Sequence, residues 1–136
     1  MHLTAPTVHG NLLSVGTSNI DSTGSVLGFH EDGRIAYRHE LPREVKWKPA
    51  SRDGEIYVAG LDGGLTVVAT DDGRTLWQSA GADALVGSPR VVEGRLFTID
   101  VRGRLKSVDA DSGSLEWGRD LDEVVSLPTA SPNTNN

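Results

Sequence analysis

A short phrase that recurs every 40 residues is the feature that most constrains the fold of this chain. It runs over residues 107–117, and more divergent copies occupy residues 67–77 and 27–37. The copies share a turn glycine and an aromatic residue four positions later, namely Gly33 with Tyr37, Gly73 with Trp77, and Gly113 with Trp117. A fixed period of this length indicates a repeat architecture, in which one supersecondary unit stacks on the next.

Each repeat predicts four short strands separated by turns. A proline precedes a short extended segment, and a glycine turn then leads into an apolar strand, as at Asp53-Gly54 and Glu93-Gly94. The third strands are predicted over residues 24–30, 65–70 and 104–109, and the fourth strands run through the repeated aromatic residues. Strands that recur about every 10 residues predict an all-β protein, and four strands per repeat are typical of a β-propeller blade. No segment has a sustained helical periodicity, so no helix is expected.

The sequence therefore predicts a partial β-propeller of three four-stranded antiparallel blades plus the start of a fourth. The blades are expected over about residues 5–40, 45–80 and 85–120. Residues 121–130 resemble the segment that leads into each repeat, and residues 131–136 form a polar tail that we expect to be disordered. Terminal repeats normally carry polar caps, and none is evident here. Two apolar blade faces are therefore expected to be open.

Composition excludes several classes of function. The 136 residues carry a formal net charge of −6, which argues against a nucleic-acid binder that depends on a basic stripe. There is no cysteine, so disulfides and thiolate metal sites are excluded. No apolar run reaches the roughly 20 residues that cross a bilayer, and the first residues lack the pattern of a secretory signal. We expect either a cytoplasmic protein or a piece of a longer chain, and the sequence leaves the compartment unknown.

The best-preserved copy of the phrase resembles the tryptophan-docking repeat of the pyrroloquinoline-quinone-type, or quinoprotein-like, β-propellers. The residues that carry the resemblance are Ser107, Asp109, Ser112, Gly113, Leu115 and Trp117. Where the family expects the Asp, the second repeat has Ala69 and the first has Phe29. The resemblance implies a propeller that usually closes with seven or eight blades. The family includes quinone-dependent alcohol dehydrogenases and non-enzymatic outer-membrane assembly lipoproteins, and its members are often extracytoplasmic.

Three carboxylates are the candidate metal ligands. Asp109 and Asp111 resemble the opening of a calcium loop, and Asp120 stands at the twelfth position counted from Asp109. Calcium prefers six to eight oxygen ligands, but Ser112 replaces the third carboxylate of the loop, and a plain turn also explains these residues. The four histidines have no partner at metal-ligand spacing, although two of them flank one hairpin and could approach each other: His2, His9, His30 and His39.

Two other segments suggest binding. Trp47 lies among basic residues and could stack on a base, or it could cover a blade edge beneath the lysine stems. These basic residues are Arg34, Arg38, Arg43, Lys46 and Lys48. The glycine-rich residues 60–64 join strand to strand, so they do not predict a phosphate loop, which opens a helix.

The sequence favours a non-catalytic repeat scaffold that binds a protein partner, or another copy of itself, through open blade faces. The alternative is a fragment of a pyrroloquinoline-quinone-dependent dehydrogenase. No aspartate matches a catalytic motif and no serine lies in a nucleophile elbow, so the chain is expected to lack enzyme activity. We expect no cofactor, with pyrroloquinoline quinone and calcium as the alternatives.

Overall fold

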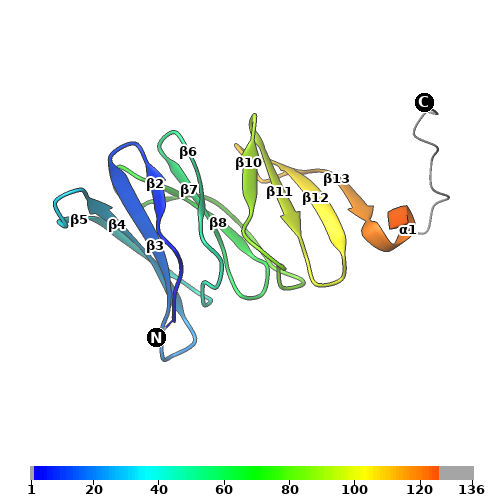
Figure 1. Cartoon of the computed structure of the whole chain (residues 1–136), viewed down its shortest axis with the longest axis horizontal. Helices are drawn as coiled ribbons and strands as arrows, with labels where there is room; N and C mark the ends of the chain where they lie inside the picture. The colour runs from blue at the N-terminus through cyan, green and yellow to red at the C-terminus, as the bar shows by residue number, and fades with distance from the viewer. Residues whose placement is uncertain (1, 126–136) are drawn as a thin grey trace.

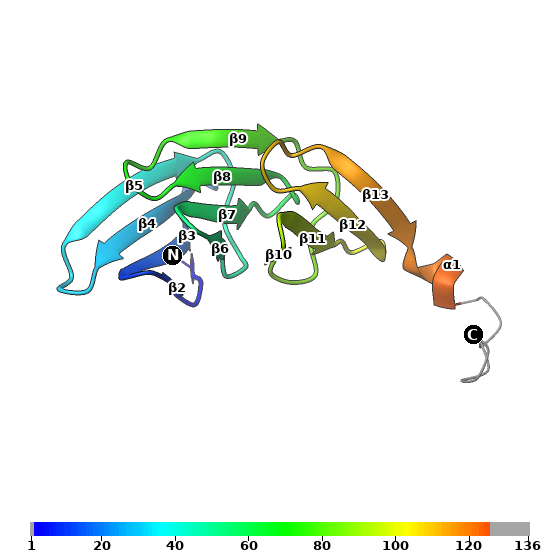
Figure 2. The same cartoon turned by 90° about the horizontal axis from the view of Figure 1, so that it is seen from above.

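Three antiparallel β-sheets lie side by side along an arc in the computed structural model, which describes residues 2–125 (Figures 1 and 2). Blade 1 contains β1 (His2–Leu3), β2 (Thr7–His9), β3 (Leu12–Ser18), β4 (Gly24–His30) and β5 (Ile35–Leu41). Blade 2 contains β6 (Ala50–Arg52), β7 (Glu55–Ala59), β8 (Leu65–Ala69) and β9 (Thr75–Ser79). Blade 3 contains β10 (Arg90–Val92), β11 (Arg95–Ile99), β12 (Arg104–Asp109) and β13 (Leu115–Asp120), and α1 (Leu121–Val125) follows it. The predicted all-β fold and three-blade organisation are confirmed.

The blades are arranged radially, with one edge strand of each on the inside of the arc. β2, β6 and β10 lie along the concave side, and β5, β9 and β13 lie along the convex side (Figure 2). The inner strand β6 contacts both β2 and β10, so the three inner edges converge. Each sheet runs in sequence order from inner to outer strand, because every connection after the inner strand is a hairpin.

The hydrophobic core lies between the blades rather than within any one of them. One cluster of buried side chains joins blades 1 and 2, and a second joins blades 2 and 3. Strand β8 of the middle blade is buried at every position. Its Val67 packs toward blade 3, and its Val68 packs toward blade 1. This packing on both faces explains why the middle strands do not alternate between apolar and polar residues.

Blade 1 has an additional strand that the sequence did not reveal. β1 and β2 both pair with β3, β1 at the end near Ser18 and β2 at the end near Leu12. They therefore share one edge of β3, and the blade remains four strands wide. In the other blades, single bridges from Val45 to Gly60 and from Leu85 to Asp100 occupy the corresponding place.

The prediction of no helix is wrong for residues 121–125, which form α1 instead of an extended lead-in. The carboxylate of Asp120 accepts a hydrogen bond from the backbone N–H of Asp122 at 3.0 Å, as an N-cap residue does. Asp122 and Glu123 in the first turn suit the positive end of the helix dipole. The remainder of the predicted lead-in, residues 126–130, and the predicted tail, residues 131–136, lie outside the described residues.

The sequence alignment of the first repeat is also wrong by one residue. In blade 3, Asp109 and Gly113 bracket the turn, because Gly113 N–H donates to the Asp109 carbonyl at 2.8 Å. In blade 1, Gly33 N–H donates to the carbonyl of His30 at 2.9 Å, so His30, and not Phe29, takes the place of Asp109. The blade 1 turn is one residue shorter, which a comparison at a fixed period could not detect.

Within residues 2–125, the structure contains no helix that is long and apolar enough to cross a membrane.

Candidate functional site

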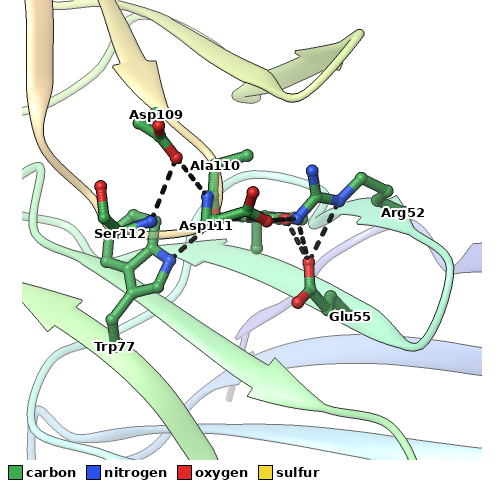
Figure 3. A network of polar contacts seen from close by, with 8 residues as sticks. Arg52, Glu55, Trp77, Asp109, Ala110, Asp111 and Ser112 are labelled. Atoms are coloured by element: carbon green, nitrogen blue, oxygen red, sulfur yellow. Dashed lines mark hydrogen bonds and ion pairs between the residues drawn. The ribbon is translucent and has the colours of Figure 1, made fainter.

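The junction between blades 2 and 3 is formed by an indole ring that lies on a glycine. Trp77 on β9 donates its Nε1–H to the carbonyl oxygen of Ala110 at 2.9 Å (Figure 3). Its ring lies against Gly113, where an added Cβ would be only 2.7 Å from Cε3 of the indole. Gly113 also has a φ of +81°, which glycine adopts without steric penalty. The repeated glycine and the repeated tryptophan are thus two halves of one contact between neighbouring blades.

Charged groups join the same two blades beside this ring. The Arg52 guanidinium contacts Asp111 of blade 3, and its Nη2 lies 2.7 Å from Oε1 of Glu55 (Figure 3). The Tyr57 hydroxyl donates to the same Glu55 carboxylate. Hydrogen bonds to Glu55 and Asp111 raise the pKa of Arg52, and burial followed by the Glu55 hydrogen bond raises the pKa of Tyr57. No local pattern in the sequence indicates this network, because its members come from two hairpins whose relative position is set by packing.

The junction between blades 1 and 2 uses the phenol ring differently. Tyr37 lies against Gly73, where an added Cβ would be 3.2 Å from Cβ of Tyr37, and it also covers Gly28 of its own sheet. Its hydroxyl is 2.5 Å from Oγ of Ser14, which is 2.9 Å from Nε2 of His9. Burial raises the pKa of Tyr37 and lowers the pKa of His9. The hydroxyl of Tyr37 therefore forms its hydrogen bond within blade 1, whereas the indole N–H of Trp77 forms its hydrogen bond with the next blade.

Among residues 2–125, no other blade packs on the face of blade 3 that points away from blade 2, called here the blade 3 end face. It presents Phe97, Ile99, Leu105 and Trp117. The strand registers place these residues at the positions that hold Tyr57, Ala59, Leu65 and Trp77 in blade 2. In blade 2 those side chains belong to the core shared with blade 3. Trp117 is instead 42% exposed, and its ring centroid lies 6.2 Å from that of Phe97.

In the described part of the chain, no other blade packs on the face of blade 1 that points away from blade 2, called here the blade 1 end face. It presents Leu13, Val15, Leu27 and Phe29, all half-buried. The corresponding residues of blade 2, Ile56, Val58, Thr66 and Val68, are buried beneath blade 1. At the edge of this face lies Gly33, where an added Cβ would meet nothing within 4 Å. The arc therefore ends in two apolar faces, as the missing caps predicted.

The three candidate calcium ligands do not converge on one point. The Asp109 carboxylate accepts from the backbone N–H of Asp111 at 2.8 Å and of Ser112 at 3.2 Å, which closes the turn. Asp120 lies opposite Arg104 in the strand register, at the far end of the β12–β13 hairpin from Asp109. Across residues 2–125, no group of three or more His, Asp or Glu side chains could hold a metal ion. The structure thus does not bring these three carboxylates together as the ligands of one calcium ion.

The histidines suggested as neighbours lie apart. His39 Nε2 is 2.9 Å from Oγ1 of Thr75 on blade 2, and its backbone pairs with Val26. His30 instead lies at the end of β4, opposite Leu12. The hairpin register separates the two rings along the strands.

Trp47 is half-buried against the core and is not part of a base-stacking platform. It packs against the cluster of blades 2 and 3 and donates its Nε1–H to the Leu85 carbonyl at 3.1 Å. Lys46 Nζ lies 4.9 Å from the indole centroid, so the lysine covers the ring. Three of the nearby arginines pair with acidic residues: Arg34 with Asp32, Arg38 with Glu40, and Arg43 with Asp62. Residues 60–64 form the strand-to-strand turn predicted for them.

Comparison with known proteins places this geometry in one family. A family model described as "Outer membrane protein assembly factor BamB" matches residues 3–123. BamB of Vibrio cholerae is 28% identical over 146 aligned residues, which cover 93% of this chain and 36% of that protein. The quinohemoprotein alcohol dehydrogenase ADH IIB of Pseudomonas putida is 32% identical over 74 residues, which cover 46% of this chain and 11% of that protein.

The solved structures agree on the fold. BamB from Moraxella catarrhalis superimposes with a TM-score of 0.74 at 15% sequence identity, over 85% of this chain and 35% of that one. The chain thus spans about a third or less of the length of the relatives it matches.

Proposed function

Because the chain belongs to the pyrroloquinoline-quinone-type repeat family whose model describes the outer membrane protein assembly factor BamB, we propose that it is a non-catalytic β-propeller module that binds protein through its open blade faces. The family contains both assembly factors and quinohemoprotein alcohol dehydrogenases. Membership alone therefore leaves both functions open.

The observation that carries the proposal is the blade 3 end face. Trp117 and Leu105 occupy the positions at which Trp77 and Leu65 bury themselves against the next blade. Contiguous exposed apolar surface of this kind marks protein-binding sites, and tryptophan is enriched among the residues that dominate binding energy. The face already has the shape of one half of a blade junction, so another β-sheet of similar surface is the kind of partner it suits.

A photo-crosslinking side chain placed at position 117 tests the binding function in cells that express the chain. The matched control is position 76 on β9, because Leu76 is 39% exposed but belongs to neither end face. We expect a protein adduct at position 117 well above that at position 76. Equal yields at the two positions would remove support for an interaction through this face.

The dehydrogenase alternative is tested with the cofactor itself. The chain is titrated with pyrroloquinoline quinone in the presence of Ca²⁺ while the fluorescence of Trp47, Trp77 and Trp117 is followed. We expect no saturable change and no dye-linked oxidation of a primary alcohol. A saturable, calcium-dependent change would favour the dehydrogenase fragment over the scaffold.

A further inference from the structure

Within the described residues, one of the repeated aromatic rings and one of the repeated turn glycines take no part in a contact between blades. Tyr37 lies on Gly73 and Trp77 lies on Gly113, each ring on the turn glycine of the following blade. Trp117 has no following blade among the described residues, and no ring lies on Gly33. The chain therefore presents an unused half of the same contact at each end of the arc.

The two end faces also match each other in their apolar residues. Inside the chain, the face of blade 2 that contains Tyr57 and Leu65 packs on the face of blade 3 that contains Leu96 and Val108. The blade 3 end face repeats the first of these surfaces, and the blade 1 end face repeats the second. A surface that presents Phe97, Leu105 and Trp117 thus has its natural complement at the other end of the same chain.

Charge favours the same pairing. Arg95 takes the position of Glu55 on β11, and its Nε lies 3.2 Å from Oε1 of Glu116 on β13, so the blade 3 end face carries an ion pair where blade 2 carries a glutamate. The blade 1 turn around Gly33 contains Glu31 and Asp32. Asp32 pairs with Arg34 of its own turn at 2.8 Å, so Glu31 is the acidic residue that would face Arg95 of a second copy and help to fix the register of the two faces.

We infer that a second copy of this chain covers these faces head to tail, with Trp117 of one copy lying over Gly33 of the other. The inference rests on the proposed function, since it uses the same blade faces. The contact is heterologous, because two different surfaces meet, and two copies related by a twofold axis can close a ring in which the junction occurs twice. The curvature of the arc, with its inner strands converging, is in the sense that such a ring requires (Figure 2).

Light scattering on the purified full chain, measured over a concentration series, tests this directly. We expect a mass about twice the 14.5 kDa of one chain. Trp117→Glu should return the mass to that of one chain and weaken association at least about tenfold, as loss of a central tryptophan does. The matched control Leu76→Glu lies on the middle blade and should leave the mass unchanged.

A mixing experiment separates head-to-tail from face-to-face contact. Trp117→Glu places a carboxylate on the apolar blade 3 end face, and Phe29→Glu places one on the apolar blade 1 end face. Each variant alone should be a single chain, but an equimolar mixture should form a heterodimer through its one intact junction. Circular dichroism and the thermal midpoint of each variant show whether it is folded.

Three outcomes would overturn the inference. The first is a wild-type chain that stays a single copy at every concentration, and the second is an assembly that persists in Trp117→Glu. The third is a dimer of Phe29→Glu alone, which would mean that two blade 3 end faces meet.

A charge reversal gives an independent check, since Arg95→Glu should weaken association and Glu31→Arg in the same chain should restore it. A single-copy result would still leave the crosslinking test of the proposed function standing, because that test accepts any protein partner.

Discussion

Gly113 meets two separate requirements, a left-handed backbone and a ring lying against its α-carbon. Gly113→Ala should destabilise the fold by about 1–2 kcal/mol for the backbone conformation. It should add about 1–3 kcal/mol because the indole of Trp77 must move from a Cβ only 2.7 Å away. Gly54→Ala is the matched control, since φ is +72° there and nothing lies within 4 Å. Urea unfolding measures the free energy of unfolding of both variants. Equal losses of this free energy in Gly113→Ala and Gly54→Ala would mean that the ring contact contributes nothing.

The indole N–H of Trp77 has a role distinct from that of its ring. Trp77→Phe keeps an aromatic surface but removes the 2.9 Å bond to the Ala110 carbonyl. We expect a loss of about 1–2 kcal/mol in the free energy of unfolding, the usual effect of leaving a buried acceptor with a weaker partner. Trp77→Ala should cost about 3–5 kcal/mol, because the blade junction then also loses its ring. If the two substitutions proved equally costly, the hydrogen bond and not the packing would dominate.

His9 makes stability depend on pH because its imidazole is partly buried beside Ser14. Burial lowers the pKa of His9, so the unfolded chain binds a proton more readily than the folded one. Its contribution is therefore fully present above the unfolded pKa of about 6.5 and is lost as the pH falls from there toward the folded pKa. His9→Gln should flatten the slope of unfolding free energy against pH in this window. An unchanged slope in the variant would assign the pH dependence to other groups.

At the scale of elements, ion pairs between hairpins add little to the blade junctions. Arg52 and Asp111 join blades 2 and 3, but the Asp111 side chain is 78% exposed, and exposed pairs typically contribute less than about 1 kcal/mol. Asp111→Asn should therefore lower the free energy of unfolding slightly, and 1 M salt should remove the difference by screening. Asp71→Asn is the matched control, since Asp71 pairs with Arg74 within its own turn. A loss that survives high salt would point to a structural role for the turn itself.

At the scale of the whole molecule, stability comes from the interfaces between blades. Both hydrophobic clusters lie between sheets, so a blade on its own has no hydrophobic core. We expect the middle blade alone, residues 42–82, to be unfolded, with narrow amide dispersion in its NMR spectrum. The chain of residues 2–125 should unfold cooperatively under the same conditions. A dispersed spectrum for the single blade would show that the sheet, rather than the junction, is the unit of stability.

The sequence by itself determined the repeat, the strand order within each repeat and the glycines of the turns. These features depend on residues close together along the chain, because a hairpin is closed by its own turn and its own backbone hydrogen bonds. The period of 40 residues also identified the aromatic residues that meet the next blade.

Only the tertiary structure decided what each repeated residue contacts. Trp77 bonds across to blade 3, whereas Tyr37 turns inward to Ser14, because Gly28 leaves room for its ring in blade 1. The one-residue shortening of the blade 1 turn and the separation of Asp109 from Asp120 likewise follow from strand register. The hydrogen bonds of Trp47 and Trp77 between blades join residues more than 30 positions apart, and their geometry depends on how the sheets pack, which no local pattern records.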